Sequence, residues 1–268
     1  MATYVFSDVH GHFGTLDRLL ERVSPTSDDT IFMLGDMIDR GPDPISVVKC
    51  CHELPNTTVL MGNHEDLMLS YYADPQDTMA QINWEINGAY PTQNGFHSLP
   101  IDERVELARW IFTLPLYAQT EVGGRRYLLV HAGIDPTRID AEGVEQWDEE
   151  AIDTMVGNQY RDDLMWIRDD FWGAPTGLVN DRGEGPIVIA GHTPTKYLDY
   201  MADRPDRAAM GPEGLCRMIR VGACEKTGNV ADRWDIDCGC AGGAGFGQLL
   251  MLRLDDGEEI YEPVHEGE

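Results

Sequence analysis

Five short polar motifs hold the residue types best suited to metal and phosphate chemistry. They read Ser-Asp-Val-His-Gly (7–11), Gly-Asp-Met-Ile-Asp-Arg-Gly (35–41), Gly-Asn-His-Glu (62–65), Val-His-Ala-Gly (130–133) and Gly-His-Thr (191–193). Aspartate, asparagine and histidine side chains are donors suited to manganese, iron or zinc ions. The candidate metal ligands are Asp8, His10, Asp36, Asn63, His131 and His192.

The spacing of these residues suggests a site with two metal ions. Asp8 and His10 are two residues apart, so both can reach one ion where the chain leaves a strand. Asp36 can bridge two ions, and the three remaining ligands would complete the second site. Two ions about 3.5–4 Å apart can hold both oxygens of a phosphoryl displacement and lower the pKa of a bound water. The motifs therefore predict a two-metal hydrolytic centre.

Each motif follows a short apolar run typical of a buried β-strand. The runs are residues 3–6, 30–34, 57–61, 125–131 and 187–190. Apolar residues at helical spacing separate the first three runs, which predicts an α/β fold with a parallel sheet covered on both faces. Because ligands bind at the carboxyl ends of strands in such sheets, we expect the motifs to converge on one site.

The rest of the chain shows no repeat and no clear domain boundary, so we predict a single domain over residues 1–268. Residues from about 66 to 116 carry several helical stretches and are predicted to form a helical insertion. A hairpin with a glycine turn is predicted over 117–131. Residues 135–185 are acidic and mixed, with loops around 173–185, and 199–215 are expected to be a loop. Further strands are predicted at 235–238, 248–254 and 259–261.

The composition excludes several classes of protein. The formal net charge is −27 and the isoelectric point is near 4.4. Nucleic-acid binding depends on lysine and arginine contacts to phosphates, so we expect no nucleic-acid partner. We find no apolar run long enough to span a bilayer and no signal-peptide pattern at the N-terminus, and we expect a cytoplasmic protein without a membrane partner.

Six cysteines are spread unevenly along the chain, without the spacing of a zinc knuckle. We interpret them as free thiols or small core residues, as expected in the cytoplasm. A zinc or redox site that uses Cys238 and Cys240 is the alternative.

The order of the motifs resembles that of the metallophosphoesterase superfamily, and of the bacterial phosphoprotein phosphatases in particular. That order is G-D-x-H-G, G-D-x-x-D-R-G, G-N-H-E, H-A-G and G-H, and the resemblance spans residues 7–193. Ser7 stands where the family usually has glycine. The resemblance implies a calcineurin-like fold, with central mixed β-sheets flanked by helices. It also implies two divalent ions, manganese first, with iron or zinc as alternatives.

By resemblance, several of the motif residues take a role in phosphoester hydrolysis. Asp8, His10 and Asp36 would hold the first ion. The second ion would be held by Asp36, Asn63, His131 and His192. A hydroxide bridging the ions would attack phosphorus, and His64 would act as general acid toward the leaving alkoxide. Asp39 would orient His64, as an adjacent carboxylate stabilises an imidazolium.

Arg40 and Asn63 would bind phosphate oxygens, and the planar fork of arginine suits this task. The family uses a second phosphate-binding arginine, for which Arg168 in Trp166-Ile167-Arg168 is the candidate. A surface salt bridge to a neighbouring aspartate is the alternative role for Arg168. Asp237 is either a residue that supports the metal ligands or part of a structural turn.

Two residues favour one substrate class. Symmetrical diadenosine tetraphosphatases typically have alanine where this chain has Asp39 and aspartate where it has Glu65, whereas the protein phosphatases match it at both. We therefore expect phosphomonoester hydrolysis, with phosphoserine or phosphothreonine proteins as first substrates. Dinucleoside polyphosphates and small phosphate esters are the alternatives. A module that only binds phosphorylated partners is disfavoured, because a binder needs no general acid.

Three aromatic residues of the insertion have two possible roles. Trp84, Tyr90 and Phe96 can stack on a nucleotide base or form the core of a helical cap.

The net charge of the chain also bears on the choice of substrate. Two ions and the arginines would make one positive pocket in an acidic protein, which favours compact phosphates or phosphopeptides with basic flanks over long polyanions.

Overall fold

The computed structural model describes residues 1–142 and 144–268. They form two compact units: Met1–Pro115 with Gly239–Glu268, and Leu116–Cys238. The prediction of a single domain stays a prediction. Within the described ranges, no helix has the length and apolar character needed to cross a membrane.

The first unit is built on a mixed sheet in the order β10-β9-β1-β2-β3. Its strands are β1 (Thr3–Phe6), β2 (Thr30–Met33), β3 (Thr57–Val59), β9 (Gln248–Arg253) and β10 (Glu258–Pro263). β1, β2 and β3 are parallel, whereas β9 and β10 form an antiparallel hairpin. Phe6 pairs with Met33, and Met33 pairs with Val59, so the carboxyl ends of the three parallel strands are level. Polar residues that follow these strands therefore reach one edge of the sheet.

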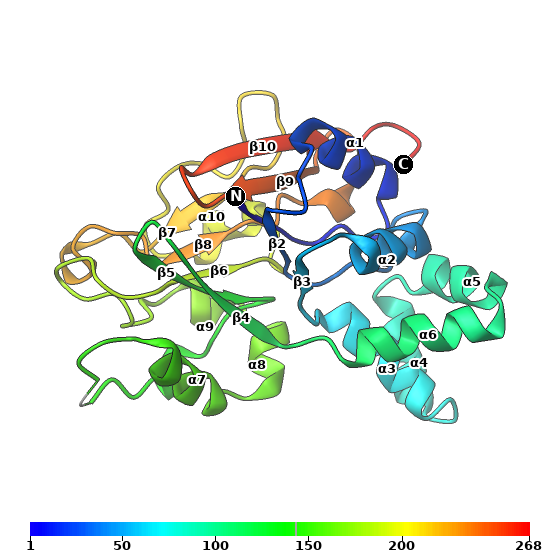
Figure 1. Cartoon of the computed structure of the whole chain (residues 1–268), viewed down its shortest axis with the longest axis horizontal. Helices are drawn as coiled ribbons and strands as arrows, with labels where there is room; N and C mark the ends of the chain where they lie inside the picture. Colours follow the sequence, from blue (N-terminus) through cyan, green and yellow to red (C-terminus); the bar gives the residue numbers. More distant parts are fainter. Residues whose placement is uncertain (143) are drawn as a thin grey trace. The chain divides into compact units, whose positions relative to one another are not determined.

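Two helices connect the parallel strands and agree with the predicted periodicity. They are α1 (Phe13–Val23) and α2 (Pro44–Glu53). Leu16 and Leu19 of α1 are fully buried, and this helix packs on β9 and β10 (Figure 1). Asp43 caps α2 by accepting a hydrogen bond from the amide of Ser46 at 3.2 Å, which satisfies one free donor of the first turn.

The predicted insertion is helical. It consists of α3 (Asn63–Ala73), α4 (Thr78–Ile86), α5 (Tyr90–Ser98) and α6 (Ile101–Phe112). Trp84 and Phe96 are fully buried, as expected of core residues, and Tyr90 is 73% exposed. The insertion begins earlier than predicted, because α3 starts inside the third motif, directly after Gly62.

The second unit holds a mixed sheet in the order β4-β5-β6-β8-β7. Its strands are β4 (Tyr117–Val122), β5 (Arg125–Val130), β6 (Ile187–Ala190), β7 (Ile219–Val221) and β8 (Arg233–Asp235). β5, β6 and β8 are parallel, whereas β4 and β7 are antiparallel to their neighbours. The predicted hairpin is confirmed as β4 and β5, joined by Gly123 and Gly124 with positive φ. The fold is thus α/β, with two mixed sheets flanked by helices.

In the second unit, one predicted strand was misplaced and one strand was missed. The strand expected at 235–238 is β8, at Arg233–Asp235, and β7 was not predicted. β8 is disguised by a charged residue, since Arg233 is fully buried, pairs with Asp232 at 3.0 Å and donates to the carbonyls of Phe171 and Trp172. The mixed stretch 135–185 contains short helices before residue 173, and the expected loop at 199–215 begins inside a short helix.

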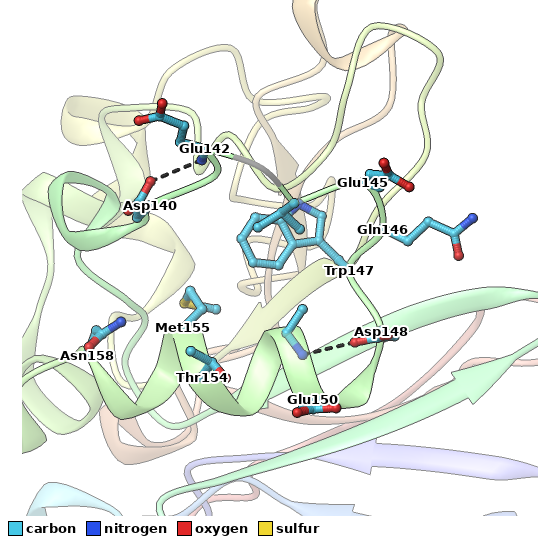
Figure 2. Close-up of a pocket in the computed structure, with 12 residues that line it drawn as sticks. Asp140, Glu142, Glu145, Gln146, Trp147, Asp148, Glu150, Thr154, Met155 and Asn158 are labelled. Atoms are coloured by element: carbon cyan, nitrogen blue, oxygen red, sulfur yellow. Dashed lines mark hydrogen bonds between the residues drawn. The ribbon is translucent and has the colours of Figure 1, made fainter.

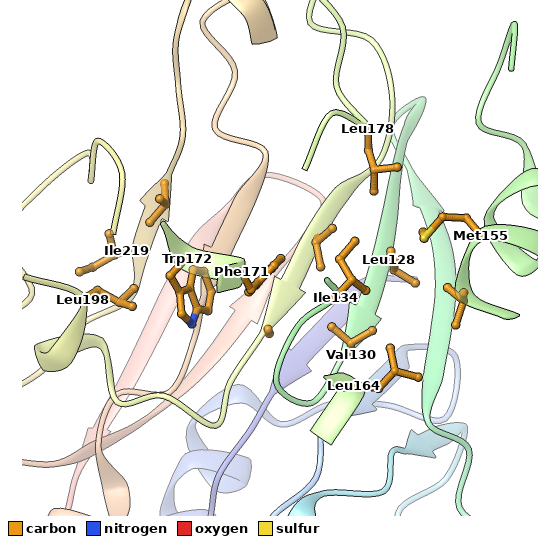
Figure 3. Close-up of a cluster of buried hydrophobic side chains, with 14 of the residues drawn as sticks. Leu128, Val130, Ile134, Met155, Leu164, Phe171, Trp172, Leu178, Leu198 and Ile219 are labelled. Atoms are coloured by element: carbon orange, nitrogen blue, oxygen red, sulfur yellow. The ribbon is translucent and has the colours of Figure 1, made fainter. Parts of the chain in front are cut away.

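The helices of the second unit are short. They are α7 (Glu149–Gly157), α8 (Arg161–Trp166), α9 (Asp169–Trp172) and α10 (Leu198–Met201). Single 3₁₀ turns lie at Pro136–Arg138, Thr195–Tyr197 and Glu225–Thr227, with one in the first unit at Cys240–Gly242. Phe171 and Trp172 of α9 are fully buried against apolar side chains of the sheet, among them Val130 and Val188 (Figure 3). This core fixes the strand ends on which the last two motifs lie.

Candidate active site

The first two motifs form two loops that bind each other through the backbone. The amide of Asp8 donates to the carbonyl of Gly35 at 3.1 Å, and the amide of His10 donates to that of Asp36 at 2.9 Å. The amide of Gly41 returns to the carbonyl of His10 at 2.9 Å. These bonds hold the polar side chains at the carboxyl ends of β1 and β2. Ser7, the departure from the family pattern, donates its hydroxyl to Asp8.

The motif backbone is strained in a way that marks a functional site. Ten described non-glycine residues have a positive φ, and six of them are motif residues. These six are Asp8, His10, Asp36, Asp39, Arg40 and His192. Such conformations cost about 1–3 kcal/mol each and persist only where the surroundings hold them.

Glu65 holds the second motif against the start of α3. Its carboxylate accepts the backbone amides of Asp36 at 2.9 Å, Met37 at 2.8 Å and Gly62 at 3.0 Å. Burial raises the pKa of Glu65 to about 7, and the three amide hydrogen bonds act in the opposite direction. A Cβ atom on Gly62 would lie 2.2 Å from Oδ1 of Asp36, which explains why this motif begins with glycine.

The donor set of the first unit fits a divalent cation. Nδ1 of His10 lies 3.0 Å from the carbonyl of Ile38, so it carries the proton and turns Nε2 toward Oδ2 of Asp36, 3.4 Å away. Both residues are buried. Burial and the nearby carboxylates of Glu65 and Asp8 raise the pKa of Asp36 well above its usual range. Buried carboxylates of this density need a compensating positive charge, which metal ions supply.

His64 is held in a buried pair with Asp39. Nδ1 of His64 lies 2.6 Å from Oδ2 of Asp39, and both side chains are fully buried. Nδ1 therefore carries a proton, and Nε2 is the atom that can exchange a proton with substrate. Nε2 is 3.0 Å from Nη2 of Arg40 and 3.9 Å from Oδ2 of Asp36.

Within this unit, His64 also lies near the metal donors. One donor atom each from His10, Asp36 and His64 falls within 4.8 Å of the others. These distances therefore allow His64 to be either a metal ligand or a general acid. Asn63, at the first position of α3, is buried beside it.

The insertion supplies two side chains to this pair that the sequence analysis did not assign to the site. Trp84 and Thr92 both donate hydrogen bonds to the carboxylate of Asp39, at 2.9 and 2.5 Å. The residue type of Trp84 could have indicated such a contact, because the N–H of a buried indole usually needs an acceptor.

The last two motifs lie in the second unit, at the ends of its parallel strands. His131 follows β5 and His192 follows β6, and their ring centroids are 5.0 Å apart. The amide of Gly191 donates to the carbonyl of His131 at 2.8 Å, which ties the two loops together. Both histidines are buried. The five motifs are thus divided between two sheets, three on one and two on the other.

Arg168 lies beside His192. Its Nη1 atom is 3.3 Å from the carbonyl of His192 and 3.3 Å from the hydroxyl of Thr193. The ring of Trp166 meets that of His192 edge-on, with centroids 5.9 Å apart. Arg168 is therefore next to a candidate metal ligand, which suits a phosphate-binding side chain.

Asp237 and the cysteines have structural contacts. Asp237 follows β8, where its amide donates to Oδ1 of Asp235 at 3.0 Å and its carbonyl accepts the amide of Thr195. The six cysteines form no disulfide, and both Cys238 and Cys240 are buried. In the described part of the chain, the candidate metal clusters contain histidine and aspartate, without cysteine.

The second unit contains a pocket of about 640 Å³ (Figure 2). It is lined by the segment around Trp147 and by α7, and none of the motif residues lines it. Five carboxylate residues line this pocket: Asp140, Glu142, Glu145, Asp148 and Glu150. Their charge makes it unsuited to a phosphate ligand.

Known proteins resemble this chain over most of its length. The family of calcineurin-like phosphoesterases matches residues 1–224. A symmetrical bis(5'-nucleosyl)-tetraphosphatase of Salmonella paratyphi C (strain RKS4594) is 30% identical over 293 residues, covering 98% of this chain and 95% of that protein. The chain therefore belongs to the calcineurin-like phosphoesterase family. As a member, it is a metal-dependent phosphoric ester hydrolase.

Solved structures agree on the fold. The crystal structure of a candidate diadenosine tetraphosphatase has a TM-score of 0.58 at 18% identity, covering 99% of this chain and 94% of that one. A metallophosphoesterase from Sphaerobacter thermophilus has a TM-score of 0.53 at 16% identity, covering 99% and 88%. At these identities the likeness shows the fold alone.

Proposed function

We propose that this hydrolase cleaves phosphomonoesters of alcohols, with His64 as general acid. The observation that carries the proposal is the buried pair of His64 and Asp39, 2.6 Å apart. A carboxylate at this distance fixes the imidazole ring and stabilises its protonated form. In the proposed reaction, His64 supplies a proton from Nε2 to the leaving oxygen.

The proposed metal ligands follow the motif order of the family. Asp8, His10 and Asp36 are proposed to bind one ion. The second ion is proposed to take Asp36, Asn63, His131 and His192. Manganese is the proposed metal, with iron or zinc as alternatives that these donors also suit. When bound, the ions would supply an activated water and neutralise charge on the phosphate.

Arg40 is proposed to bind phosphate oxygens. Arg40 is exposed, and its guanidinium lies against the Nε2 atoms of His10 and His64, at 3.4 and 3.0 Å. A guanidinium fork in this place can hold a phosphate so that its leaving oxygen faces His64. Asn63 and Arg168 are proposed as further phosphate contacts.

The leaving group distinguishes the two candidate substrate classes. An alkoxide from serine or threonine is a strong base, so its departure needs a proton in the transition state. Symmetrical cleavage of a dinucleoside tetraphosphate releases a nucleoside diphosphate, which is a far weaker base and leaves without help. A dedicated acid supported by a buried carboxylate therefore favours phosphoserine or phosphothreonine proteins.

A specific observation favours the second candidate. The Salmonella paratyphi C relative carries the name of a symmetrical tetraphosphatase, and it matches this chain over nearly its full length. Hydrolysis of dinucleoside tetraphosphates is therefore the alternative function. A cytoplasmic location is part of the proposal for either function, since the six cysteines form no disulfide.

Two chromogenic esters test the proposed reaction class. With added manganese, we expect p-nitrophenyl phosphate to be hydrolysed at least about tenfold faster, by kcat/KM, than bis(p-nitrophenyl) phosphate. The reason is that Arg40 and its neighbours are proposed to bind a terminal phosphate with two free charges. Bound metal is measured in the same samples. A protein that holds metal yet prefers the diester would contradict the proposal.

A further inference from the structure

The carboxylate of Asp39 is held from three sides. His64 binds Oδ2 through Nδ1, and Trp84 donates its indole N–H to the same oxygen at 2.9 Å. Thr92 donates its hydroxyl to Oδ1 at 2.5 Å and accepts the amide of Asp39 at 2.9 Å. All four side chains are fully buried. A carboxylate with donors on both oxygens cannot rotate, so the ring of His64 is fixed as well.

The same part of the insertion also holds the next residue. The amide of Arg40 donates to the carbonyl of Gly88 at 3.0 Å. Gly88 has a φ of +96°, and a Cβ atom there would lie 2.9 Å from Cγ of Arg40. Asp39 and Arg40 have φ values of +70° and +67°, a conformation that needs outside support. The link between α4 and α5 provides that support.

Packing alone does not account for these contacts. The ring of Trp84 lies 5.2 Å from that of Tyr71 and 5.8 Å from that of Tyr72, which is ordinary core packing. A core needs no polar atoms aimed at one carboxylate, however, and a buried charge without donors would be costly. The donors come from two helices, 45 and 53 residues beyond Asp39 in the chain.

We propose that Trp84, Gly88 and Thr92, the α4–α5 corner, position the catalytic pair and Arg40. The insertion then contributes to the active site, because it fixes the orientation of the His64 ring and therefore the position of its Nε2 atom. This inference rests on the proposed function, in which His64 is the general acid. Trp84 and Thr92 act through Asp39 and are positioning residues.

The test uses two monoesters with different demands on a general acid. Phenyl phosphate releases a basic phenolate, whereas 2,4-dinitrophenyl phosphate releases a weak base that needs little protonation. We expect Thr92→Val and Trp84→Phe to lower kcat on phenyl phosphate about tenfold or more. On the dinitrophenyl ester, kcat should change less than about twofold, with KM and bound manganese unchanged.

Two controls separate positioning from stability. Thr92→Ser keeps the hydroxyl and should restore the wild-type ratio of the two rates. Phe96→Leu disturbs the packing of α5 without touching Asp39, and it should affect both esters equally. Equal losses on both esters in Thr92→Val and Trp84→Phe would overturn the inference, provided that His64→Asn shows the selective loss. If His64→Asn itself lowers both rates equally, the general-acid assignment fails and this inference fails with it.

Discussion

His64→Asn is expected to lower kcat on phenyl phosphate by about 10²–10⁴-fold, the usual contribution of a general acid. Asparagine cannot give up a proton to the leaving oxygen, although its amide can still hydrogen-bond to Asp39. The loss should shrink toward a few-fold on 2,4-dinitrophenyl phosphate, because that leaving group needs little protonation. Steady-state kinetics on the two esters measure this difference.

Metal content decides between the two roles that the geometry of His64 allows. We expect His64→Asn to keep the manganese content of the wild type, measured by elemental analysis after gel filtration. His97→Asn is a suitable control, because this histidine is exposed on α5. A loss of bound metal in His64→Asn would show that His64 is a ligand, and the general-acid assignment would be wrong.

Asp36→Asn is expected to remove metal binding and to lower kcat more than about 100-fold, beyond the effect of losing a residue that only supports ligands. The carboxylate of Asp36 is the proposed bridge between the ions, and a neutral amide cannot replace its charge. Isothermal titration with manganese and kinetics on p-nitrophenyl phosphate measure the two losses.

Asp36→Asn is expected to affect the stability of the metal-free protein differently from its metal binding. Burial and the charges of Glu65 and Asp8 raise the pKa of Asp36, so its ionised form is unfavourable in the folded state. Removing that charge should leave the Tm in chelator unchanged or higher. Manganese should raise the Tm of the wild type alone, by mass action on the folded state. Wild-type manganese affinity in Asp36→Asn would exclude Asp36 as a metal ligand.

The sequence was sufficient for the parts of the fold that follow a regular pattern. Apolar spacing placed α1 at Phe13–Val23, and the two glycines placed the turn between β4 and β5. All five motifs lie at strand ends, because glycine and polar residues mark where an apolar strand stops. β8 was predicted too far along the chain, since its first residue, Arg233, is a buried charge that breaks the apolar pattern.

The supporting residues of the site depended on contacts that are distant in sequence. Glu65 was noted for its residue type, but its three amide hydrogen bonds depend on how α3 meets the second motif. Trp84 and Thr92 reach Asp39 from helices whose packing no local pattern encodes. Most residues proposed to bind metal or phosphate belong to the five motifs, whereas the residues that orient them are found through tertiary structure.

One comparison of substrates tests the central claim most directly. It measures kcat/KM at equal enzyme concentration, with manganese, for a phosphoserine peptide with basic flanks and for diadenosine tetraphosphate. A general acid poised for an alkoxide predicts that the phosphopeptide is preferred by at least about tenfold. A clear preference for diadenosine tetraphosphate would contradict the account and assign the protein the activity named for its Salmonella relative.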